Sequence, residues 1–514
     1  MNDGPTPVPD EEIIAAIKDG LRQLVLPCFP ADASLDRTWD DVLAMNAADR
    51  LVYWFGDEFI AASAGDPAAV RRAIDGDLLQ IDRMISAQLD AVLHHPVLQE
   101  LEASWRGLRW LVDQVEEGPG DRVIVRALNI SWHEIERDMQ RASDFDQSQL
   151  FRKIYEFEFG VAGGEPFGLL LVDHAVRLRR ERYDGTDDIA VLEHLAMVAA
   201  AAWAPTVVGA APGLLGVETF AELGAVSDPA GAFRAPEYEN WRRLRGRLDA
   251  RFLAVAVPRV LARPLWADDG SRGDGFRYRE RAATVAERLW MNAGFAFAAV
   301  AARAAARFGW PADVRGADPD RVGGGLVTTL PMDPHRLSQT LALPRLPVEV
   351  VFTDHQERAL IESGLMPVGA PPHGEELLFG GVRSLHRPTL PAGPAGQAAF
   401  ADSRIATQFN AILCASRFAH YLKMRGRQTI GRLRRPEEVE LDLRTWLAGF
   451  VNKNPSSTAA TRASHPLFDA SVRVSERPDK PGVFHCSIEL QPYFQLDNVT
   501  ANFNFETEIT PPRT

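Results

Sequence analysis

Residues 416–435, SRFAHYLKMRGRQTIGRLRR, combine a histidine and aromatic side chains with a dense run of basic residues and no acidic one. The basic residues are Arg417, Lys423, Arg425, Arg427, Arg432, Arg434 and Arg435. Clustered cations can bind nucleic-acid phosphates, and His420 could act as a general acid or base. His420 also lies one helical turn from Ser416 beside an apolar face, which favours a structural histidine over a catalytic one.

Two further histidine arrangements raise the possibility of a metal site. WHEIERD (132–138) begins like a zinc-protease motif, but Arg137 stands where the second histidine is required, so the motif fails. The adjacent His94 and His95 precede Pro96 at a predicted helix end, where capping and packing are commoner than metal ligation. Because the cysteines at 28, 414 and 486 form no CxxC pair, we expect neither a disulfide framework nor a sulfur-rich zinc site, and we expect no metal or cofactor.

The glycine-rich stretch VAGGEPFG (161–168) contains Gly163, Gly164, Glu165 and Pro166. Phosphate-binding loops favour basic or neutral surroundings, whereas acidic YEFEFG precedes this stretch, so we interpret it as a tight turn into a strand. A nucleophile elbow (GxSxG) is absent, and no lysine follows a glycine, which excludes a Walker A loop. The sequence assembles no catalytic set, and we expect the protein not to be an enzyme.

Composition limits the remaining classes. A chain of 514 residues predicts two or three domains. The net charge of −14 disfavours bulk nucleic-acid binding, although a local basic patch stays possible. The acidic, proline-rich N-terminus does not resemble a signal peptide, and no uncharged apolar run is long enough to span a bilayer. We therefore expect a cytoplasmic protein without membrane insertion.

The elements that would position these residues alternate between helix and strand. Apolar residues at three- and four-residue steps predict two amphipathic helices over 78–92 and 98–112. The strands predicted by apolar runs are 122–130, 165–176, 251–261 and 346–353, and the further helices are 187–204, 279–307, 354–364 and 402–425. This order predicts a mixed α/β (α+β) body. A Pro/Gly-rich stretch at 388–397 marks a plausible domain boundary.

The clearest β signal lies at the C-terminus. Phe484, Cys486, Ile488 and Leu490 alternate with polar residues, and the alternation resumes at Val499, Ala501, Phe503 and Phe505. Two alternating runs joined by a short polar connection predict a hairpin. Because an isolated hairpin is marginal in water, these strands need a larger sheet to join.

Several stretches, in the same order along the chain, resemble the large subunit of the type VI secretion contractile sheath (the TssC/VipB family). The stretches that carry the resemblance are SAQLDAVLHHPVLQELEASWRGLRWLV (86–112), YEFEFGVAGGEPFGLLLVDH (155–174), VAAAAWAPTVVGAAPGLLG (198–216), DARFLAVAVPRVLARPLW (249–266), RLWMNAGFAFA (288–298), GWPADVRG (309–316), SRFAHYLKMRGRQTIG (416–431) and KPGVFHCSIELQPYFQLDNV (480–499). Together they span about residues 78–514. An ordered set of blocks is more specific than any single motif above.

The resemblance implies a structural, phage-tail-sheath-like protein of the bacterial cytoplasm. Its implied partners are the small sheath subunit, further copies of this chain, the inner tube protein, the baseplate and an AAA+ unfoldase that disassembles the sheath. Large and small subunits would form a heterodimer that polymerises helically around the tube, and contraction would drive the tube outward. Strands from neighbouring subunits would complete the C-terminal sheet.

We expect an N-terminal extension or linker (1–77), a central sheath domain (78–395) and a C-terminal sheath domain (396–514) with the terminal hairpin. The residues expected to make structural or interface contacts are Trp105, Arg106, Gly163, Gly164, Glu165, Pro166, Arg417, His420, Arg432, Arg434, Arg435, Phe484, Ile488, Val499, Phe503 and Phe505. Pro436, Glu437 and Glu438 follow the basic stretch as an acidic helix start. We therefore interpret 416–435 as a core helix whose arginine-rich end meets acidic partners in this chain or on the next subunit.

Overall fold

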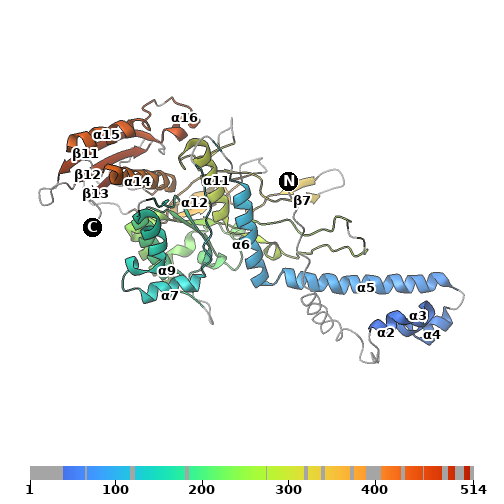
Figure 1. Ribbon diagram of the computed structural model, residues 1–514. Helices are drawn as coiled ribbons and strands as arrows, with labels where there is room; N and C mark the ends of the chain where they lie inside the picture. The colour runs from blue at the N-terminus through green and yellow to red at the C-terminus, as the bar shows by residue number, and fades with distance from the viewer. Residues whose placement is uncertain are drawn as a thin grey trace. The chain divides into compact units, whose positions relative to one another are not determined.

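The computed structural model describes residues 39–63, 66–115, 118, 122–161, 163–179, 185–271, 273, 275–317, 322–336, 342–370, 376–388, 407–429, 435–454, 456–476, 484–492 and 503–509. They form a mixed α/β protein with several sheets, which confirms the predicted fold class (Figure 1). The chain divides into two compact units, Met1–Ile85 and Ser86–Thr514.

The first unit is helical where it is described. It contains α2 (Trp39–Ala44), α3 (Ala47–Phe55), α4 (Asp57–Ala62) and most of α5 (Pro67–Leu93). Asn46 caps α3 by accepting a hydrogen bond from the Asp49 amide, and the Trp54 indole donates to Asp77 at 2.7 Å. The helix predicted over 78–92 is confirmed by α5, which crosses the domain limit predicted at residue 77. None of its described residues is buried.

A four-stranded parallel sheet forms the centre of the second unit. Its strands are β1 (Leu170–Val176), β2 (Thr206–Ala210), β3 (Leu253–Val257) and β9 (Leu365–Pro367), in the order β1-β2-β3-β9. Side chains alternate between two cores. Leu253, Val255 and Val257 enter the core that includes α9 (Asp188–Ala202), whereas Ala254 and Ala256 enter the core that includes α11 (Ala293–Phe308). Because both faces are covered, β3 is a continuous apolar run.

Helices and short pairings surround this sheet. The α9 side also carries α7 (Trp132–Arg141), α8 (Gln149–Phe151), the π-helix η3 (Arg152–Gly160), α10 (Glu239–Gly246) and α12 (Asp354–Glu362), and the α11 side carries α6 (Pro96–Asp113). Two-stranded pairings join β4 (Val260–Leu261) to β5 (Trp290–Met291), β6 (Leu326–Val327) to β10 (Leu377–Leu378), and β7 (Asp333–Arg336) to β8 (Ala342–Arg345). Short 3₁₀ turns are η2 (Phe145–Gln147), η4 (Pro212–Leu215), η5 (Phe220–Ala225), η6 (Gly231–Arg234), η7 (Pro236–Tyr238), η8 (Leu248–Phe252) and η9 (Val285–Glu287).

Most predicted elements of this body are present. The helices predicted over 98–112, 187–204 and 354–364 are α6, α9 and α12. Residues 165–176 contain β1, and residues 251–261 contain β3 and β4, separated by a cis Val257–Pro258 bond.

Three predictions were wrong. Residues 122–130 are extended but form no strand, and most of them are exposed rather than buried. Residues 346–353 form only an isolated bridge, between Val260 and Val348. The helix predicted over 279–307 begins only at Ala293, because the Asn292 side chain caps it and the preceding residues form β5 and a buried polar network.

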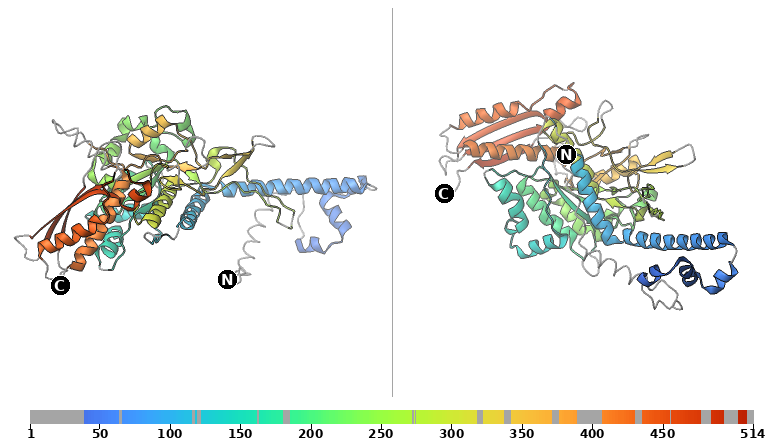
Figure 2. Two further views of the ribbon diagram at one scale, coloured as in Figure 1. Left: turned by 90° about the horizontal axis from the view of Figure 1, so that it is seen from above. Right: turned by 45° about the vertical axis from the view of Figure 1, so that its right-hand side comes forward.

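The C-terminal region forms a second layered structure. An antiparallel sheet contains β11 (Leu467–Glu476), β12 (Phe484–Pro492) and β13 (Phe503–Ile509), and the helices are α14 (Phe409–Thr429), α15 (Pro436–Ala448) and α16 (Ala459–Ser464). Both views in Figure 2 show α14 and α15 (orange) lying along the strands (red). The predicted hairpin is confirmed by β12 and β13, and this chain itself supplies a third strand, β11, which was not predicted. The boundary stretch 389–397 lies outside the described residues.

Candidate functional site

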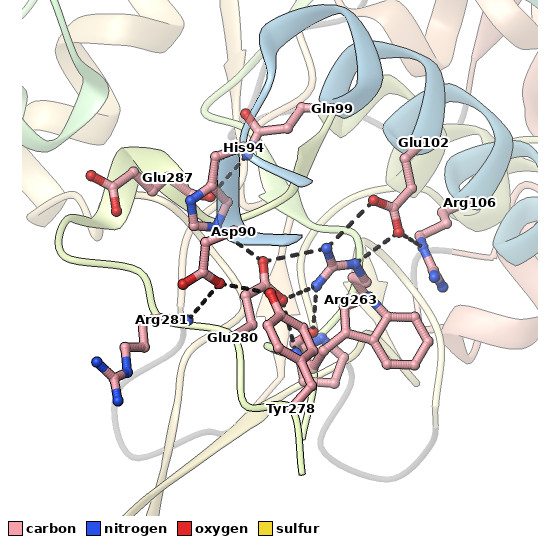
Figure 3. Close-up of polar contacts among 12 residues, drawn as sticks. Asp90, His94, Gln99, Glu102, Arg106, Arg263, Tyr278, Glu280, Arg281 and Glu287 are labelled. Carbon is pink, nitrogen blue, oxygen red and sulfur yellow. Dashed lines mark hydrogen bonds and ion pairs between the residues drawn. The ribbon is translucent and has the colours of Figure 1, made fainter. Parts of the chain in front are cut away.

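A buried polar network joins the start of α6 to the loop between β4 and β5 (Figure 3). Its centre is Glu280, whose side chain is 1% exposed and bonds Arg263 at 2.6 Å and His94 at 3.2 Å. Arg263 also bonds Glu102 on α6 at 2.8 Å, and Glu102 bonds Arg106 at 2.6 Å. Every carboxylate in this set faces a cation, as buried charges require.

Titration behaviour agrees with this pairing. Burial raises the pKa of the Glu102 carboxyl, but its bonds to Arg263 and Arg106 outweigh burial, so the net pKa is lowered. Burial likewise lowers the pKa of Arg263, and its bonds to Glu280 and Glu102 reverse the direction. These groups stay charged near neutral pH. The network therefore holds α6 in place electrostatically.

The same network accounts for the histidine pair at the start of α6. His94 contacts Glu280, and His95 is the residue that precedes the helix, with Pro96 in its first turn. Within the described residues, no group of three or more His, Cys, Asp or Glu side chains is placed to hold a metal ion. The residues of the Glu280 network are far apart in sequence, so local spacing could not have indicated them. Only the order of the family-like blocks could have done so.

His420 on α14 is a buried structural contact. Its Nε2 donates to the Ala202 carbonyl at the end of α9, 3.1 Å away, and its ring meets Phe159 edge-on at a centroid distance of 5.3 Å. Burial lowers the pKa of its imidazole to about 4, so the ring is neutral near pH 7. This geometry joins α14 to two elements of the central body.

The described cations of α14 also bind within the chain. Arg427 donates to the carbonyls of Phe159, Gly160 and Val161 at 2.6–2.8 Å, at the C-terminal end of η3, where a cation is favoured. Lys423 donates to the Tyr155 hydroxyl and lies 3.7 Å from the centre of the Phe159 ring. These contacts direct the basic residues inward, which disfavours a phosphate-binding face.

Two other arginines of α14 contact aromatic rings: Arg417 lies over Tyr421, and Arg425 lies over Trp446. Arg425 also pairs with Asp442 of α15 at 3.3 Å. Arg425 thus gives α14 one acidic partner within this chain, whereas the predicted meeting concerned the arginine-rich end of the stretch, 432–435. Arg432 and Arg434 lie outside the described residues, and Arg435 is exposed immediately before α15. An interface role for these last three arginines stays a prediction.

The glycine-rich stretch forms the predicted tight turn before β1. Gly163 has φ +86°, and a Cβ at Gly164 would lie 2.2 Å from the Glu158 carbonyl oxygen, so both positions need glycine. Glu165 bonds Arg126 at 2.5 Å, while Pro166 is half-buried. In the C-terminal sheet, Ile488 is buried and lies opposite Phe505; Leu490 lies opposite Phe503, and Phe484 opposite Ile509. Val499 lies outside the described residues.

A cavity of about 880 Å³ lies at the carboxyl ends of β1 and β2, where α/β sheets often bind ligands. Asp173, His174 and Arg259 are among its lining residues. Asp173 is accessible from the cavity but is surrounded by protein atoms, and this desolvation raises the pKa of its carboxyl. His174 pairs with Asp188 at 3.0 Å, and Arg259 is bidentate to Glu349 at 2.8 and 2.9 Å. These two contacts join segments that are distant in sequence.

One side of α6 presents an exposed apolar row. The row is Val97, Leu101, Trp105 and Val112, and Trp105 is 66% exposed. Its neighbour Arg106 turns away from the row, toward Glu102 and the Trp266 ring. An exposed tryptophan in an apolar row is typical of a protein–protein contact surface.

Two family models match the chain in sequence order. The first, described as EvpB/VC_A0108 tail sheath N-terminal domain, matches residues 75–386, and the second, the tail sheath gpW/gp25-like domain, matches residues 398–509. The chain is therefore a protein of the tail-sheath class. It belongs to the family of type VI secretion sheath large subunits (VipB). It is 30% identical over 443 residues to the type VI secretion system sheath protein TssC1 of Pseudomonas aeruginosa, an alignment that covers 85% of this chain and 86% of that protein.

Proposed function

We propose that this chain pairs with a small sheath subunit and that the heterodimers polymerise helically around an inner tube, so that contraction propels the tube and its effectors out of the cell. The observation that carries the proposal is the match of both sheath domains, in order, over most of the chain. The proposal places the protein in the bacterial cytoplasm. The baseplate and a disassembling AAA+ unfoldase are its further partners.

The described structure is consistent with a mechanical role for this protein. The buried carboxylates Glu280 and Glu349 pair with arginines, while apolar side chains on α5 and α6 face outward. No helix in the described ranges is long and apolar enough to cross a bilayer. Rigid, internally paired domains with exposed apolar rows suit subunits that exchange contacts with neighbours when a lattice contracts.

Electron microscopy of the chain coexpressed with its small partner tests the proposal. We expect long tubules from the wild-type pair and none from Trp105→Ala, because truncating an exposed anchor aromatic typically costs about 2 kcal/mol or more of contact free energy. The matched control is Leu441→Ala, an exposed apolar residue on α15. Small monodisperse particles from the wild-type pair would contradict the sheath function itself. Normal tubules from Trp105→Ala would remove only Trp105 from the interface.

A further inference from the structure

The end of the π-helix η3 is held from outside by α14. η3 spans nine residues, whereas π-helices are rare and mostly single-turn features that often mark functional sites. A π-helix of this length therefore depends on contacts with other elements. The carbonyls of Phe159, Gly160 and Val161 at its end all accept hydrogen bonds from Arg427, at 2.6–2.8 Å. One side chain of α14 thus fixes the last turn of η3.

The face of α14 that meets η3 differs from its opposite face. His420, Lys423 and Arg427 are spaced by three and four residues, so they lie on one side of the helix. The other side carries the apolar residues that pack with α15, β11 and β12, namely Ala415, Phe418 and Leu422. α14 therefore shares an apolar core with the C-terminal sheet, but it holds η3 through hydrogen bonds and ring contacts. Contacts of this kind can be released without opening an apolar core.

The same turn of η3 also holds Arg126 of the extended segment 122–130. Glu158 bonds Arg126 at 2.5 Å and accepts a hydrogen bond from the Glu165 amide at 3.0 Å. The Glu165 carboxylate bonds the second terminal nitrogen of the Arg126 guanidinium, also at 2.5 Å. We call Arg126 and these two carboxylates the Arg126 clamp. Because the two carboxylates lie on either side of carbonyls 159–161 along the chain, the clamp depends on the shape of the turn that Arg427 holds.

We propose that docking of α14 on η3 controls the Arg126 clamp. While Arg427 holds the end of η3, the two carboxylates stay together and Arg126 is clamped. When α14 withdraws, the turn opens and Arg126 is released. η3 is the element with two states, because a long π-helix that loses its outside contacts reverts to a tighter helix or unwinds.

The consequence of release falls on an exposed part of the central body. α14 lies in the range of the second family model, whereas η3 and segment 122–130 lie in the range of the first. Ile124 and Leu128 of this segment are both 52% exposed. A displacement of the C-terminal region thereby changes the position of an exposed apolar segment that it does not itself have to touch.

Limited proteolysis of the full chain with trypsin tests the release of Arg126. Trypsin must bind the guanidinium of the arginine after which it cleaves, so the clamp protects Arg126. Arg427→Ala should raise the rate of cleavage after Arg126 at least about tenfold, because cleavage follows the population of the released form. Glu158→Gln weakens the clamp directly and supplies the rate for released Arg126. Arg425→Ala is the matched control, because Arg425 pairs with Asp442 of α15, and it should leave this rate unchanged.

Hydrogen–deuterium exchange on the same variants tests whether η3 transmits the effect. In Arg427→Ala, amides of 152–165 should exchange at least about tenfold faster, while those of β12 keep their wild-type rates. Arg427→Lys keeps the charge but cannot reach three carbonyls at once, so it should give intermediate rates.

Two results would overturn the coupling. One is a change in η3 exchange without a change in cleavage after Arg126, or the reverse. The other is faster exchange throughout, including β12, which would assign the effect to global loss of stability. These measurements use this chain alone, so their outcome is separate from that of the tubule experiment.

Discussion

Strands β1 and β3 were both predicted from apolar stretches of the sequence, although β1 also contains Asp173 and His174, and the folded chain covers them differently. β3 lies inside the sheet with both faces and both edges covered, whereas β1 lies at the margin and is mostly half-buried. Apolar residues in a strand indicate that it will be covered, without indicating which molecule covers it. In an assembling protein, a strand left half-covered by its own chain marks where a neighbour is expected.

We expect the largest effect on the unfolding free energy from a change in the buried network around Glu280. Arg263→Ala leaves Glu280 without its closest cation, and breaking such a buried pair costs about 3–5 kcal/mol of unfolding free energy. Urea unfolding of the chain measures this cost. Arg109→Ala is the control, since its partner Asp113 is exposed, and such pairs contribute about 0–1 kcal/mol. Equal losses in the two variants would mean that the network does not hold α6 in place.

Apolar truncations can compare the buried strand β3 with the exposed segment 122–130. Leu253→Ala in β3 should lower the unfolding free energy by about 2–5 kcal/mol, because it leaves a cavity in a closed core. Leu128→Ala, at an exposed residue of segment 122–130, should change it by less than about 0.5 kcal/mol. A large stability loss at Leu128 would break the comparison.

The same contrast explains how far the sequence could predict the molecule. Periodicity and capping residues locate α5, α6, α9, α12 and the β12–β13 hairpin, since these signals are local. The same signals predict a strand in both 122–130 and 251–261, but only the second range contains strands, because burial depends on chain segments distant in sequence. The Glu280 network is equally non-local: His94 lies 186 residues from Glu280. Predicting the interface residues is harder still, because their partners are other chains.

A titration effect should distinguish α14 from an exposed basic patch. The pKa of His420 is about 4 in the folded chain, below the value of about 6.5 for an unfolded chain. The unfolded chain therefore binds the proton first, and stability falls as pH drops from about 6.5 to about 4. The loss from this group approaches about 3 kcal/mol, since each pKa unit corresponds to about 1.36 kcal/mol.

His420→Gln removes the titrating group and should flatten this part of the pH–stability curve. His465→Gln is the control, because that imidazole is only partly buried. Unfolding free energies measured by urea titration at several pH values between 4 and 7 give both slopes. Parallel curves for wild type and His420→Gln would show that the imidazole is not buried neutral and that the α9–α14 contact differs from the one described.

The smallest effect on folding is expected for the three arginines that are predicted to contact a neighbouring subunit. Replacing Arg432, Arg434 and Arg435 by Glu should change the unfolding free energy by less than about 0.5 kcal/mol if these arginines contact a neighbouring subunit rather than their own. The same triple variant should impair tubule formation, because reversing charges at a contact replaces attraction with repulsion. Arg427→Glu, which breaks three bonds to the end of η3, is the internal counterpart and should destabilise the folded chain instead. Normal tubules from the triple variant would make these three arginines part of a solvated surface and would restrict the role of this basic stretch to joining α14 to its own chain.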